Sequence, residues 1–497
     1  MDYDVVVVGT GMGGGTLAWS LARSGKKVLM VERGNSSIDP AYGQNEKKMM
    51  VEMLGYESRE IVINGVRRRP YLGGAVGGSS ALYGAALLRP ARADFTPGFS
   101  YGERLPRHLW DWPVGYDELE PWYDAAEELY RVSGDVDQQK PHIEQRRSAY
   151  PGKVPGYEPI SEKLADGIRR QGFAPFHIPL AVDFERCLRC PTCPGYACPN
   201  HARSSSWSRC VSDAVNQHGA ELWTNTEAVR VISQGNRAVS LELNRSGRVV
   251  EVKAERFVLS GGALGSPSLL IKSGLEGASG QVGRNYMYHA GAVAVGLFAR
   301  PTGASIRFAK QVAFSDLYFG APDFPHKLGY AQTIPVPGPK TIAKELGVPL
   351  PGALFRGVYD HAITLTGIVE DLPQPENRVF PTRFGFELNH RFHPYDLRRS
   401  MYYMTRLKRV MRSAGAALVI GATADKDKTH LAHQVGTCRF GNDPQTSVLD
   451  RSCRLHDKAN VYVVDGSFFP TSLGVGPALT IAANALRVAD LIERNAA

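Results

Sequence analysis

The sequence predicts an α/β protein with a Rossmann-like βαβ unit, and three observations support this fold class. Residues 5–34, "VVVVGTGMGGGTLAWSLARSGKKVLMVERG", have the pattern of a buried strand, a glycine turn, an amphipathic helix and a second strand. Residues 257–274, "FVLSGGALGSPSLLIKSG", repeat the order of strand, glycine turn and helix. A chain of 497 residues is also too long for one small core, so we expect two interwoven domains.

Composition and charge exclude several classes of protein. Hydrophobic residues make up 43% of the chain, but no apolar run approaches the roughly 20 residues that a membrane helix needs. The first residues lack the basic segment of a secretion signal, so we expect a cytoplasmic protein without a membrane span. The net charge is +9, but the charged residues are interspersed and the longest basic run, Arg67 to Arg69, is short. No nucleic-acid partner is therefore expected.

The glycine turn near the N-terminus predicts a dinucleotide site. Gly9, Gly11 and Gly14 match the pattern G-x-G-x-x-G, in which the first glycine permits the tight turn, the second lets the backbone approach a pyrophosphate, and the third allows close helix packing. Glu32 ends the second strand, where a carboxylate can accept hydrogen bonds from ribose hydroxyls. The alternative is a glycine-rich structural turn, and the pattern itself does not distinguish NAD from FAD.

Three further segments have the glycine turns and polar residues typical of a cofactor site. Residues 73–90, "GGAVGGSSALYGAALLRP", are small and glycine-dense, as expected where backbone passes close to a flat ring system. The segment "HQVGTCRFG" places His433 before a tight glycine turn. Residues 461–492, "VYVVDGSFFPTSLGVGPALTIAANALRVADLI", give a strand, an acid and a glycine, a loop and a final helix.

Together these motifs resemble the glucose/methanol/choline (GMC) family of FAD-dependent oxidoreductases, and the resemblance spans both ends of the chain. It also rests on "VGRNYMYH" (residues 282–289), similar to the family's VGRNLxDH, and on "EDLPQPENRV" (residues 370–379). The resemblance implies that FAD is the cofactor and assigns its contacts to residues of several motifs. These cofactor-binding residues are Gly9, Gly11, Gly14, Glu32, Gly77, Gly78, Ser79, Val229, Asp465, Gly466, Pro477 and Ala478.

The family also implies how the chain is divided. It predicts a discontinuous FAD-binding domain made of residues 1–90, 215–290 and 430–497. Residues 91–214 and 291–429 are then expected to form an α+β substrate-binding domain with a large, mostly antiparallel sheet. The predicted fold is therefore a Rossmann-like FAD-binding domain interleaved with a substrate domain.

The resemblance implies an oxidoreductase that acts on the CH–OH group of an alcohol or sugar by hydride transfer to N5 of the flavin. His433 is the candidate base for the hydroxyl proton, because imidazole has an ordinary pKa of about 6.5 and suits proton transfer near neutral pH. Without the resemblance, a histidine beside a glycine turn is more often a structural hydrogen-bonding residue. Residues 111–134 are most similar to the branches that oxidise pyranoses and glycosides.

Several functional alternatives stay open at the level of sequence. Oxygen or a quinone would reoxidise the flavin, and no motif separates an oxidase from a dehydrogenase. A FAD-containing lyase is a second possibility, and the flavin subunit of a multi-subunit dehydrogenase complex is a third. The complex would include a small partner subunit, whereas a self-contained enzyme would act alone or as a homo-oligomer.

The sequence departs from the family pattern at several positions, and two of them, Gly476 and Leu82, bear on the substrate and the flavin. Gly476 stands where the family has an asparagine or a second histidine that hydrogen-bonds to the substrate oxygen. Three residues are candidates to replace this group: His430, His361 and Asn389. Leu82 stands where some sugar oxidases have the histidine that bonds covalently to the flavin, so we expect FAD to be bound non-covalently.

Four of the seven cysteines lie close together, in "CLRCPTCPGYACP" (residues 187–199). Their spacing, C-x2-C-x2-C-x4-C-P, differs by one residue from the run found in bacterial ferredoxins. Four thiolates can bind zinc, and a related subgroup holds an iron–sulfur cluster in this region. We nevertheless expect no metal, and we interpret Cys187, Cys190, Cys193 and Cys198 as structural thiols or a local disulfide in a loop near the approach to the active site.

Overall fold

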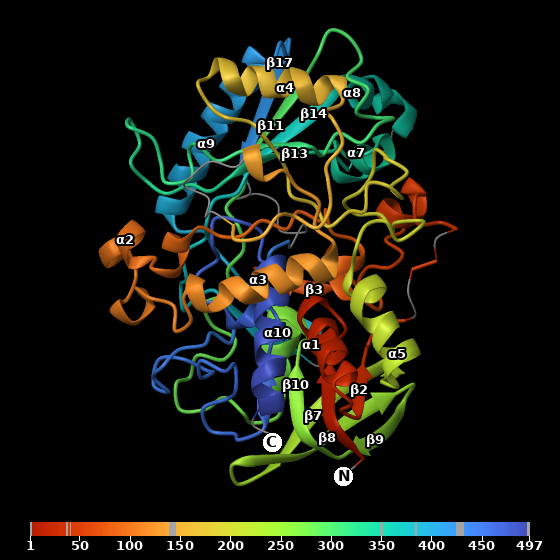
Figure 1. Ribbon diagram of the computed structural model, residues 1–497, viewed down its shortest axis with the longest axis vertical. Helices are drawn as coiled ribbons and strands as arrows, with labels where there is room; N and C mark the ends of the chain where they lie inside the picture. The colour runs from red at the N-terminus through yellow and green to blue at the C-terminus, as the bar shows by residue number, and fades with distance from the viewer. Residues whose placement is uncertain are drawn as a thin grey trace.

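The structure is a computed structural model that describes residues 2–35, 38–39, 41–138, 146–347, 351–382, 385–423 and 432–494. Two main parts are stacked along the long axis of the molecule (Figure 1). The lower part contains a parallel sheet together with the first strand and the last helix, and the upper part contains an antiparallel sheet. Within the described ranges, no helix is both long enough and apolar enough to span a bilayer.

A five-stranded parallel sheet forms the centre of the lower part. The strands β18 and β2 are apolar and fully buried and β1 is mostly so, as expected of parallel strands that helices cover, whereas the edge strand β6 is partly exposed. Early, middle and late parts of the chain therefore contribute to one sheet. The strand order is β18 (Val461–Val463), β10 (Ala254–Leu259), β1 (Tyr3–Val8), β2 (Val28–Val31) and β6 (Glu221–Trp223).

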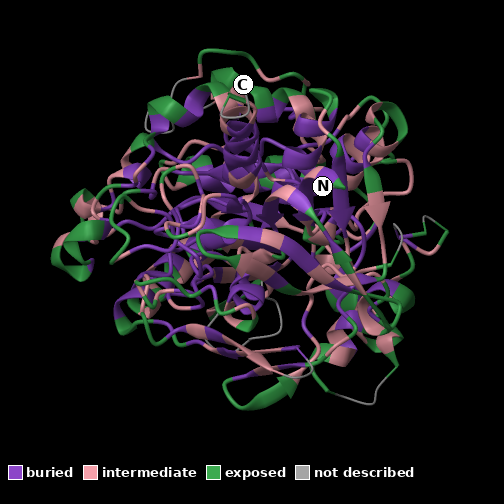
Figure 2. Ribbon diagram, turned by 90° about the horizontal axis from the view of Figure 1, so that it is seen from below, coloured by how far each residue is buried: buried purple, intermediate pink, exposed green. Residues whose placement is uncertain are grey.

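Helices pack on this sheet and on one another. The first helix follows the glycine turn directly and contacts the last helix, which is buried along most of its length and also contacts α3. Figure 2 shows that exposed residues lie at the rim of the molecule, while the central strands and helices are largely buried. These helices are α1 (Met12–Arg23), α3 (Tyr116–Tyr130), α5 (Ser212–His218), α6 (Gly262–Lys272) and α10 (Ala478–Arg494).

A three-stranded antiparallel sheet lies beside the parallel sheet at the lower edge of the molecule (Figure 1). Its first strand has a bulge at Val229, because Ala228 and Arg230 pair with consecutive residues of the neighbouring strand and leave Val229 outside the ladder. A bulged residue keeps its backbone groups free for another partner. The strands are β7 (Thr226–Gln234), β8 (Arg237–Arg245) and β9 (Arg248–Val252).

The upper part is built on a six-stranded sheet in which every pair of neighbouring strands is antiparallel. Its order is β17 (Leu418–Thr423), β11 (Ala292–Leu297), β14 (Ala362–Gly367), β13 (Ala331–Ile334), β12 (Val312–Phe314) and β5 (Phe176–His177). Two helices pack against it and against each other, α4 (Pro159–Arg170) and α9 (Pro394–Ser413). The predicted class, a Rossmann-like domain joined to a domain with a large antiparallel sheet, is confirmed.

A small mixed sheet connects segments that are far apart in sequence. It joins β3 (Ile61–Ile63) and β4 (Val66–Arg68) to β15 (Arg378–Thr382) and β16 (Gly385–Asn389), with β3 parallel to β16. Three short helices complete the fold: α2 (Gly98–Tyr101), α7 (Pro339–Glu345) and α8 (Arg356–His361). The predicted domain boundaries remain a prediction.

Candidate active site

The β1–α1 turn has a close fit of backbone to backbone at two of its three glycines. Gly9 has a φ of +93°, and a Cβ at this residue would overlap the carbonyl of Ser260. A Cβ at Gly14 would overlap the carbonyl of Gly9. By contrast, a Cβ at Gly11 would meet no atom within 4 Å, so the turn is open at this residue. Close packing thus requires glycine at Gly9 and Gly14, whereas the contact of Gly11 with a pyrophosphate remains a prediction.

Thr10, between the first two glycines, connects the turn to the acid at the end of β2. One carboxylate oxygen of Glu32 accepts hydrogen bonds from the amide of Thr10 at 3.0 Å and from its hydroxyl at 2.6 Å. The other oxygen accepts from the amide of Gly34 at 2.8 Å. The Thr10 hydroxyl also accepts from the amide of Gly77 at 3.0 Å. Sequence reasoning did not select Thr10, although it is fully buried and joins two of the predicted motifs.

The loop that contains Gly77 and Gly78 packs against the open side of the turn. Both glycines have positive φ, +92° and +54°, and a Cβ at Gly78 would lie 3.2 Å from the Cα of Gly11. The hydroxyl of Ser79 accepts a hydrogen bond from the amide of Gly73 at 3.2 Å, which keeps the loop compact. The predicted cofactor residues of this loop and those of the turn therefore lie side by side.

The carboxylate of Asp465, just after β18, accepts hydrogen bonds from groups of the protein itself. One of its oxygens accepts hydrogen bonds from the amide of Gly262, at 2.9 Å, and from the hydroxyl of Ser266. The other accepts from the amide of Ser467, at 2.8 Å, and from its hydroxyl. Asp465 thus ties the start of α6 to the C-terminal segment, so its side chain positions these elements.

The C-terminal segment also carries the other predicted residues of the site. The carbonyl of Gly466 accepts a hydrogen bond from the amide of Gly436 at 3.1 Å, so the strand-like segment after His433 runs along it. Pro477 directly precedes α10, which begins at Ala478, and the first amides of a helix have no partner inside the helix. Such a helix start attracts the electron-rich oxygens of a bound group.

Four features fit a bound dinucleotide such as FAD. The N-terminus of α1 has no side-chain cap, and the space beside Gly11 is open. The bulge at Val229 leaves a backbone site free on the edge of β7. Glu32 lies at the end of β2, and its remaining lone pairs can accept from ribose hydroxyls. The residues present therefore fit the cofactor that the sequence predicts.

His433 forms a close pair with a second histidine, His289. The Nδ1 atoms of the two rings lie 2.8 Å apart. The Nε2 atom of His289 lies 3.1 Å from the carbonyl oxygen of Ser472 and 2.9 Å from that of Leu473. The Nε2 atom of His433 is directed toward Gly476, where a Cβ would lie 3.3 Å from it, and it has no hydrogen-bond partner in the described part of the chain.

The surroundings of His433 keep its ring neutral. Burial, the neighbouring His289 and the charge of Lys310 together hold the pKa of His433 well below its ordinary value. Burial also lowers the pKa of His289, although two carbonyl acceptors oppose this effect. Lys310 is buried and donates to the carbonyl of Gly84 at 2.6 Å, and burial lowers its pKa to about 8. Sequence reasoning selected neither His289 nor Lys310.

The two described residues proposed to replace the missing polar group at Gly476, His361 and Asn389, have other partners. The ring of His361 is held by the carbonyl of Phe298 at 2.8 Å. Asn389 lies at the end of β16, where it pairs with Arg378 of β15. His430 lies outside the described residues. His289 is the polar side chain next to His433, and its signal in the sequence was its place as the last residue of "VGRNYMYH".

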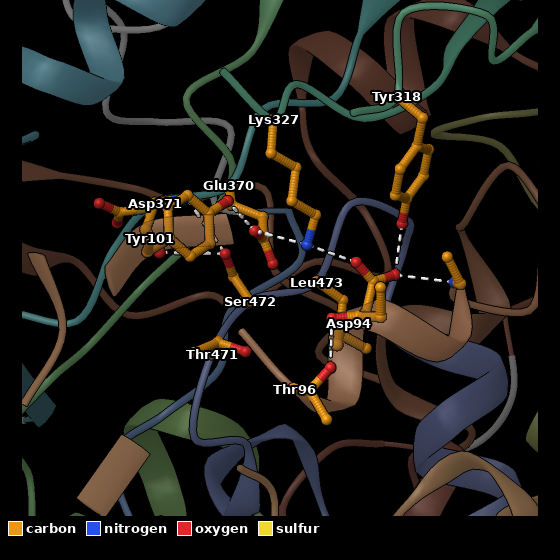
Figure 3. A network of polar contacts seen from close by, with 12 residues as sticks. Asp94, Thr96, Tyr101, Tyr318, Lys327, Glu370, Asp371, Thr471, Ser472 and Leu473 are labelled. Atoms are coloured by element: carbon orange, nitrogen blue, oxygen red, sulfur yellow. Dashed lines mark hydrogen bonds and ion pairs between the residues drawn. The ribbon is translucent and has the colours of Figure 1, made fainter. Parts of the chain in front are cut away.

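Behind the histidine pair lies a network of buried charges, shown in Figure 3. The ammonium of Lys327 stands between the carboxylates of Asp94 and Glu370, and all three side chains are buried. The hydroxyl of Tyr318 points to Asp94, and Ser472 lies beside the neighbouring residue Asp371. The backbone of Asp371, next in the chain to Glu370, is hydrogen-bonded to the hydroxyl of Ser472, and the carbonyls of Ser472 and Leu473 face His289.

The cysteine loop is a separate feature. All seven cysteines are free thiols, so the predicted local disulfide is not formed. In the described ranges, no three histidine, cysteine or acidic side chains are placed to hold a metal ion. The expected lack of a metal remains a prediction. Burial raises the pKa of the Cys187 thiol to about 11. One small cavity is lined by Cys187, Cys190, Cys193, Cys198 and Arg203, among other residues.

Comparison with known proteins identifies the family. The N-terminal and C-terminal profiles of GMC oxidoreductases match residues 3–291 and 381–485, so the chain belongs to the GMC oxidoreductase family. Paromamine 6'-oxidase from Streptomyces fradiae is 29% identical, with 100% of this chain and 93% of that protein aligned. For 2-methyl-1,2-propanediol dehydrogenase from Mycolicibacterium austroafricanum the identity is 24%, over 99% and 95% of the two chains. The predicted resemblance is confirmed.

Solved structures share the fold at low sequence identity. Pyridoxine 4-oxidase from Mesorbium loti superposes with a TM-score of 0.67 at 20% identity, over 99% of both chains. A formate oxidase variant from Aspergillus oryzae RIB40 gives a TM-score of 0.67 at 16% identity, over 99% of this chain and 98% of that one. The GMC family is FAD-dependent, and the chain is accordingly an oxidoreductase of the kind that acts on CH–OH groups.

Proposed function

We propose that this chain oxidises the CH–OH group of a sugar or related alcohol, with FAD as cofactor and His433 as base. The observation that carries the proposal is the arrangement of the His433 ring. Its Nδ1 is held by His289, whereas its Nε2 faces Gly476 and is free of partners among the described residues. Because the pKa of His433 is well below its ordinary value, the ring is neutral near pH 7 and able to accept a proton.

Each residue near His433 has a definite part in this reaction. His433 accepts the hydroxyl proton at Nε2 as a hydride leaves the carbon that carries this hydroxyl, so that a C=O bond forms. FAD, when bound, supplies the acceptor of that hydride. Gly476 has no side chain and so leaves room for the substrate beside Nε2. The segment after His433 is bonded to Gly466, and this contact keeps the base next to the segment expected to hold the cofactor.

The mode of cofactor binding is also a proposal. The pyrophosphate would lie at the start of α1 beside Gly11, and the ribose at Glu32. Val229 would present its free backbone to the adenine. The flavin would lie along Gly77, Gly78 and Ser79 and meet the start of α10 at Pro477 and Ala478. Leu82 is a buried hydrocarbon side chain that offers no atom for a covalent bond to the flavin, which supports the proposal of non-covalent FAD.

A sugar or glycoside is the proposed substrate class. Two relatives are named for oxidation of aminoglycosides: paromamine 6'-oxidase, at 29% identity, and 6'''-hydroxyparomomycin C oxidase from Streptomyces lividus, at 28%. Oxygen or a quinone would be the final electron acceptor. A second candidate, the flavoprotein of a multi-subunit dehydrogenase, is favoured by fructose dehydrogenase large subunit from Gluconobacter japonicus at 24% identity. The cytoplasmic location remains a prediction.

An anaerobic absorbance experiment tests the proposed function. Purified holoprotein is mixed with a panel of pyranoses, glycosides and simple diols, and the oxidised flavin band is followed. At least one CH–OH substrate should bleach it, and readmission of air should restore it quickly for an oxidase and slowly for a dehydrogenase. A flavin that no member of the panel bleaches contradicts the proposal and favours the lyase.

A further inference from the structure

The hydrogen bonds of His289 determine where its proton lies. Its Nε2 atom faces two carbonyl oxygens, those of Ser472 at 3.1 Å and Leu473 at 2.9 Å. Carbonyl oxygens only accept hydrogen bonds, so this nitrogen must carry the proton. A neutral imidazole has one protonated nitrogen and one acceptor, and burial favours the neutral ring here. The Nδ1 atom of His289 is therefore an acceptor.

The tautomer of His433 follows from that of its neighbour. The two Nδ1 atoms are 2.8 Å apart, so one must donate, and only His433 is able to do so. A proton on Nδ1 of neutral His433 leaves the lone pair on Nε2, the nitrogen that faces Gly476. We propose that His289 is a positioning residue that fixes His433 as the tautomer with a basic Nε2. This inference rests on the proposed function, in which Nε2 receives the substrate proton.

The carbonyls that fix His289 are themselves held by Asp371 (Figure 3). The hydroxyl of Ser472 donates to the carbonyl of Asp371 at 3.0 Å and accepts from its amide at 3.1 Å. The Asp371 carboxylate accepts from the amide of Tyr288, the residue before His289, at 3.2 Å. Asp371 thus contacts both the backbone that precedes His289 and the loop that contributes the two carbonyls.

Backbone strain is concentrated at the same contact. His433 has a φ of +62° and Leu473 a φ of +63°, in the left-handed region that residues with a side chain rarely occupy. Such conformations cost about 1–3 kcal/mol each and persist where surrounding contacts hold them, commonly at functional sites. Here one strained residue presents the base and the other presents a carbonyl that sets the tautomer.

Three variants of the holoenzyme test the assignment. His289→Leu removes the acceptor for the His433 Nδ1 proton, whereas in His289→Asn the side-chain oxygen can take the place of that acceptor. His361→Leu is the control, because this ring is held by a backbone carbonyl elsewhere in the protein. With FAD bound, His289→Leu should reduce its flavin about 10- to 1,000-fold more slowly, by analogy with the loss that follows a wrong imidazole tautomer. His289→Asn should recover part of the rate, and the control should match the parent.

The pH profile separates a positioning role from simple damage to the fold. His289 helps hold down the pKa of His433, and Lys310 is the other charged group that acts on it. Removing His289 should therefore shift the acidic limb of the flavin-reduction profile, while structural damage would lower the rate at every pH alike. A His289→Leu enzyme with a rate within about threefold of the parent and an unmoved limb would overturn the inference.

A direct readout of the parent protein does not depend on activity. In holoprotein labelled with ¹⁵N-histidine, the signal that disappears in His433→Asn belongs to His433, and it should show a protonated Nδ1 and an unprotonated Nε2. A protonated Nε2 in this signal contradicts the inference even if the proposed function holds. If instead His433→Asn reduces flavin at the parent rate, the proposed function fails while the tautomer assignment stands or falls on the spectrum.

Discussion

The glycine turn of residues 9–14 and the proposed catalytic pair, His433 with its positioning residue His289, are built in opposite ways. The turn takes its shape from residues 9–14, close together in the chain, and from the absence of side chains at its glycines. The catalytic pair takes its shape from side chains that arrive from distant segments: His289, Lys310, His433 and the loop at residues 471–473. Steric fit governs the first region, and proton position and charge govern the second.

This difference determines how each region should respond to mutation. A side chain added to the turn either collides with backbone or fills the space reserved for the cofactor, so the effect is close to all-or-none. A change at the catalytic pair leaves a folded, flavin-containing protein whose rate or pH dependence is altered. The two kinds of response can be distinguished by measuring FAD content before any kinetics.

The largest effect is expected at the open position of the turn. Gly11→Val places a side chain where a Cβ meets no protein atom within 4 Å, in a backbone conformation that any residue can adopt. The variant should fold but contain no FAD, because the pyrophosphate would meet the new side chain. Absorbance of the purified protein measures the bound flavin. Gly357→Val, on the exposed helix α8 with open space around it, is the control and should retain FAD.

A soluble Gly11→Val protein with a full complement of FAD would contradict the prediction that the pyrophosphate binds at this turn.

A large loss of stability is expected at the buried network behind the pair. Lys327→Met leaves the carboxylates of Asp94 and Glu370 without their shared cation, and all three side chains are buried. Breaking a buried ion pair in this way costs about 3–5 kcal/mol. The melting temperature and the urea midpoint should therefore fall. Lys47→Met, at an exposed pair with Glu52, should change both by little.

If Lys327→Met melted with the parent, the ion pairs of Lys327 would not contribute to the stability of the fold.

A change of pH dependence is expected at Lys310. The base is active when His433 is unprotonated, so the rate falls as the pH drops through the pKa of His433. The charge of Lys310 opposes protonation of His433, and Lys310→Met removes that charge. The pKa should rise and the acidic limb of the flavin-reduction profile should move to higher pH. Lys310→Arg keeps the charge and should leave the acidic limb at nearly the parent pH. An acidic limb at the parent pH in Lys310→Met would show that the charge of Lys310 does not act on the pKa of His433.

The smallest effect is expected at Gly476. Its φ is not in the left-handed region, so Gly476→Ala is free of backbone strain, but the new Cβ would lie 3.3 Å from Nε2 of His433. Crowding of the base should slow flavin reduction roughly 3- to 10-fold with FAD retained. Gly265→Ala, where a Cβ meets no atom within 4 Å, is the control. A Gly476→Ala enzyme with the parent rate for bulky and small substrates alike would place the substrate elsewhere.

The local part of this structure could be predicted from the sequence, and the non-local part only in outline. Strand, turn and helix of the cofactor unit follow from apolar periodicity and glycine spacing, which act over short distances in the chain. His433 was selected because its own motif matched the family. Its partner His289 was not, since a contact across 144 positions depends on how the two segments pack, and no periodicity reports that.

Thr10 and Lys310 are two further residues whose importance could not be predicted from the sequence, each for a different reason. Thr10 occupies a position that the glycine pattern leaves unspecified, yet its hydroxyl links Glu32 to Gly77. Lys310 lies in an unremarkable loop before β12 and becomes significant only because burial lowers its pKa and its charge acts on His433. Burial of a charge is a property of the folded chain, and a sequence with interspersed lysines does not indicate which of them is buried.

The rate of flavin reduction in His433→Ala tests the central claim most directly. The variant should retain FAD, because the residues that fit the cofactor lie in other segments and act largely through their backbone. In an anaerobic stopped-flow measurement with a substrate that bleaches the parent enzyme, its flavin should be reduced about 10² to 10⁴ times more slowly, the usual contribution of a positioned base. Reduction within a few-fold of the parent rate would show that another residue takes the proton and would contradict the account.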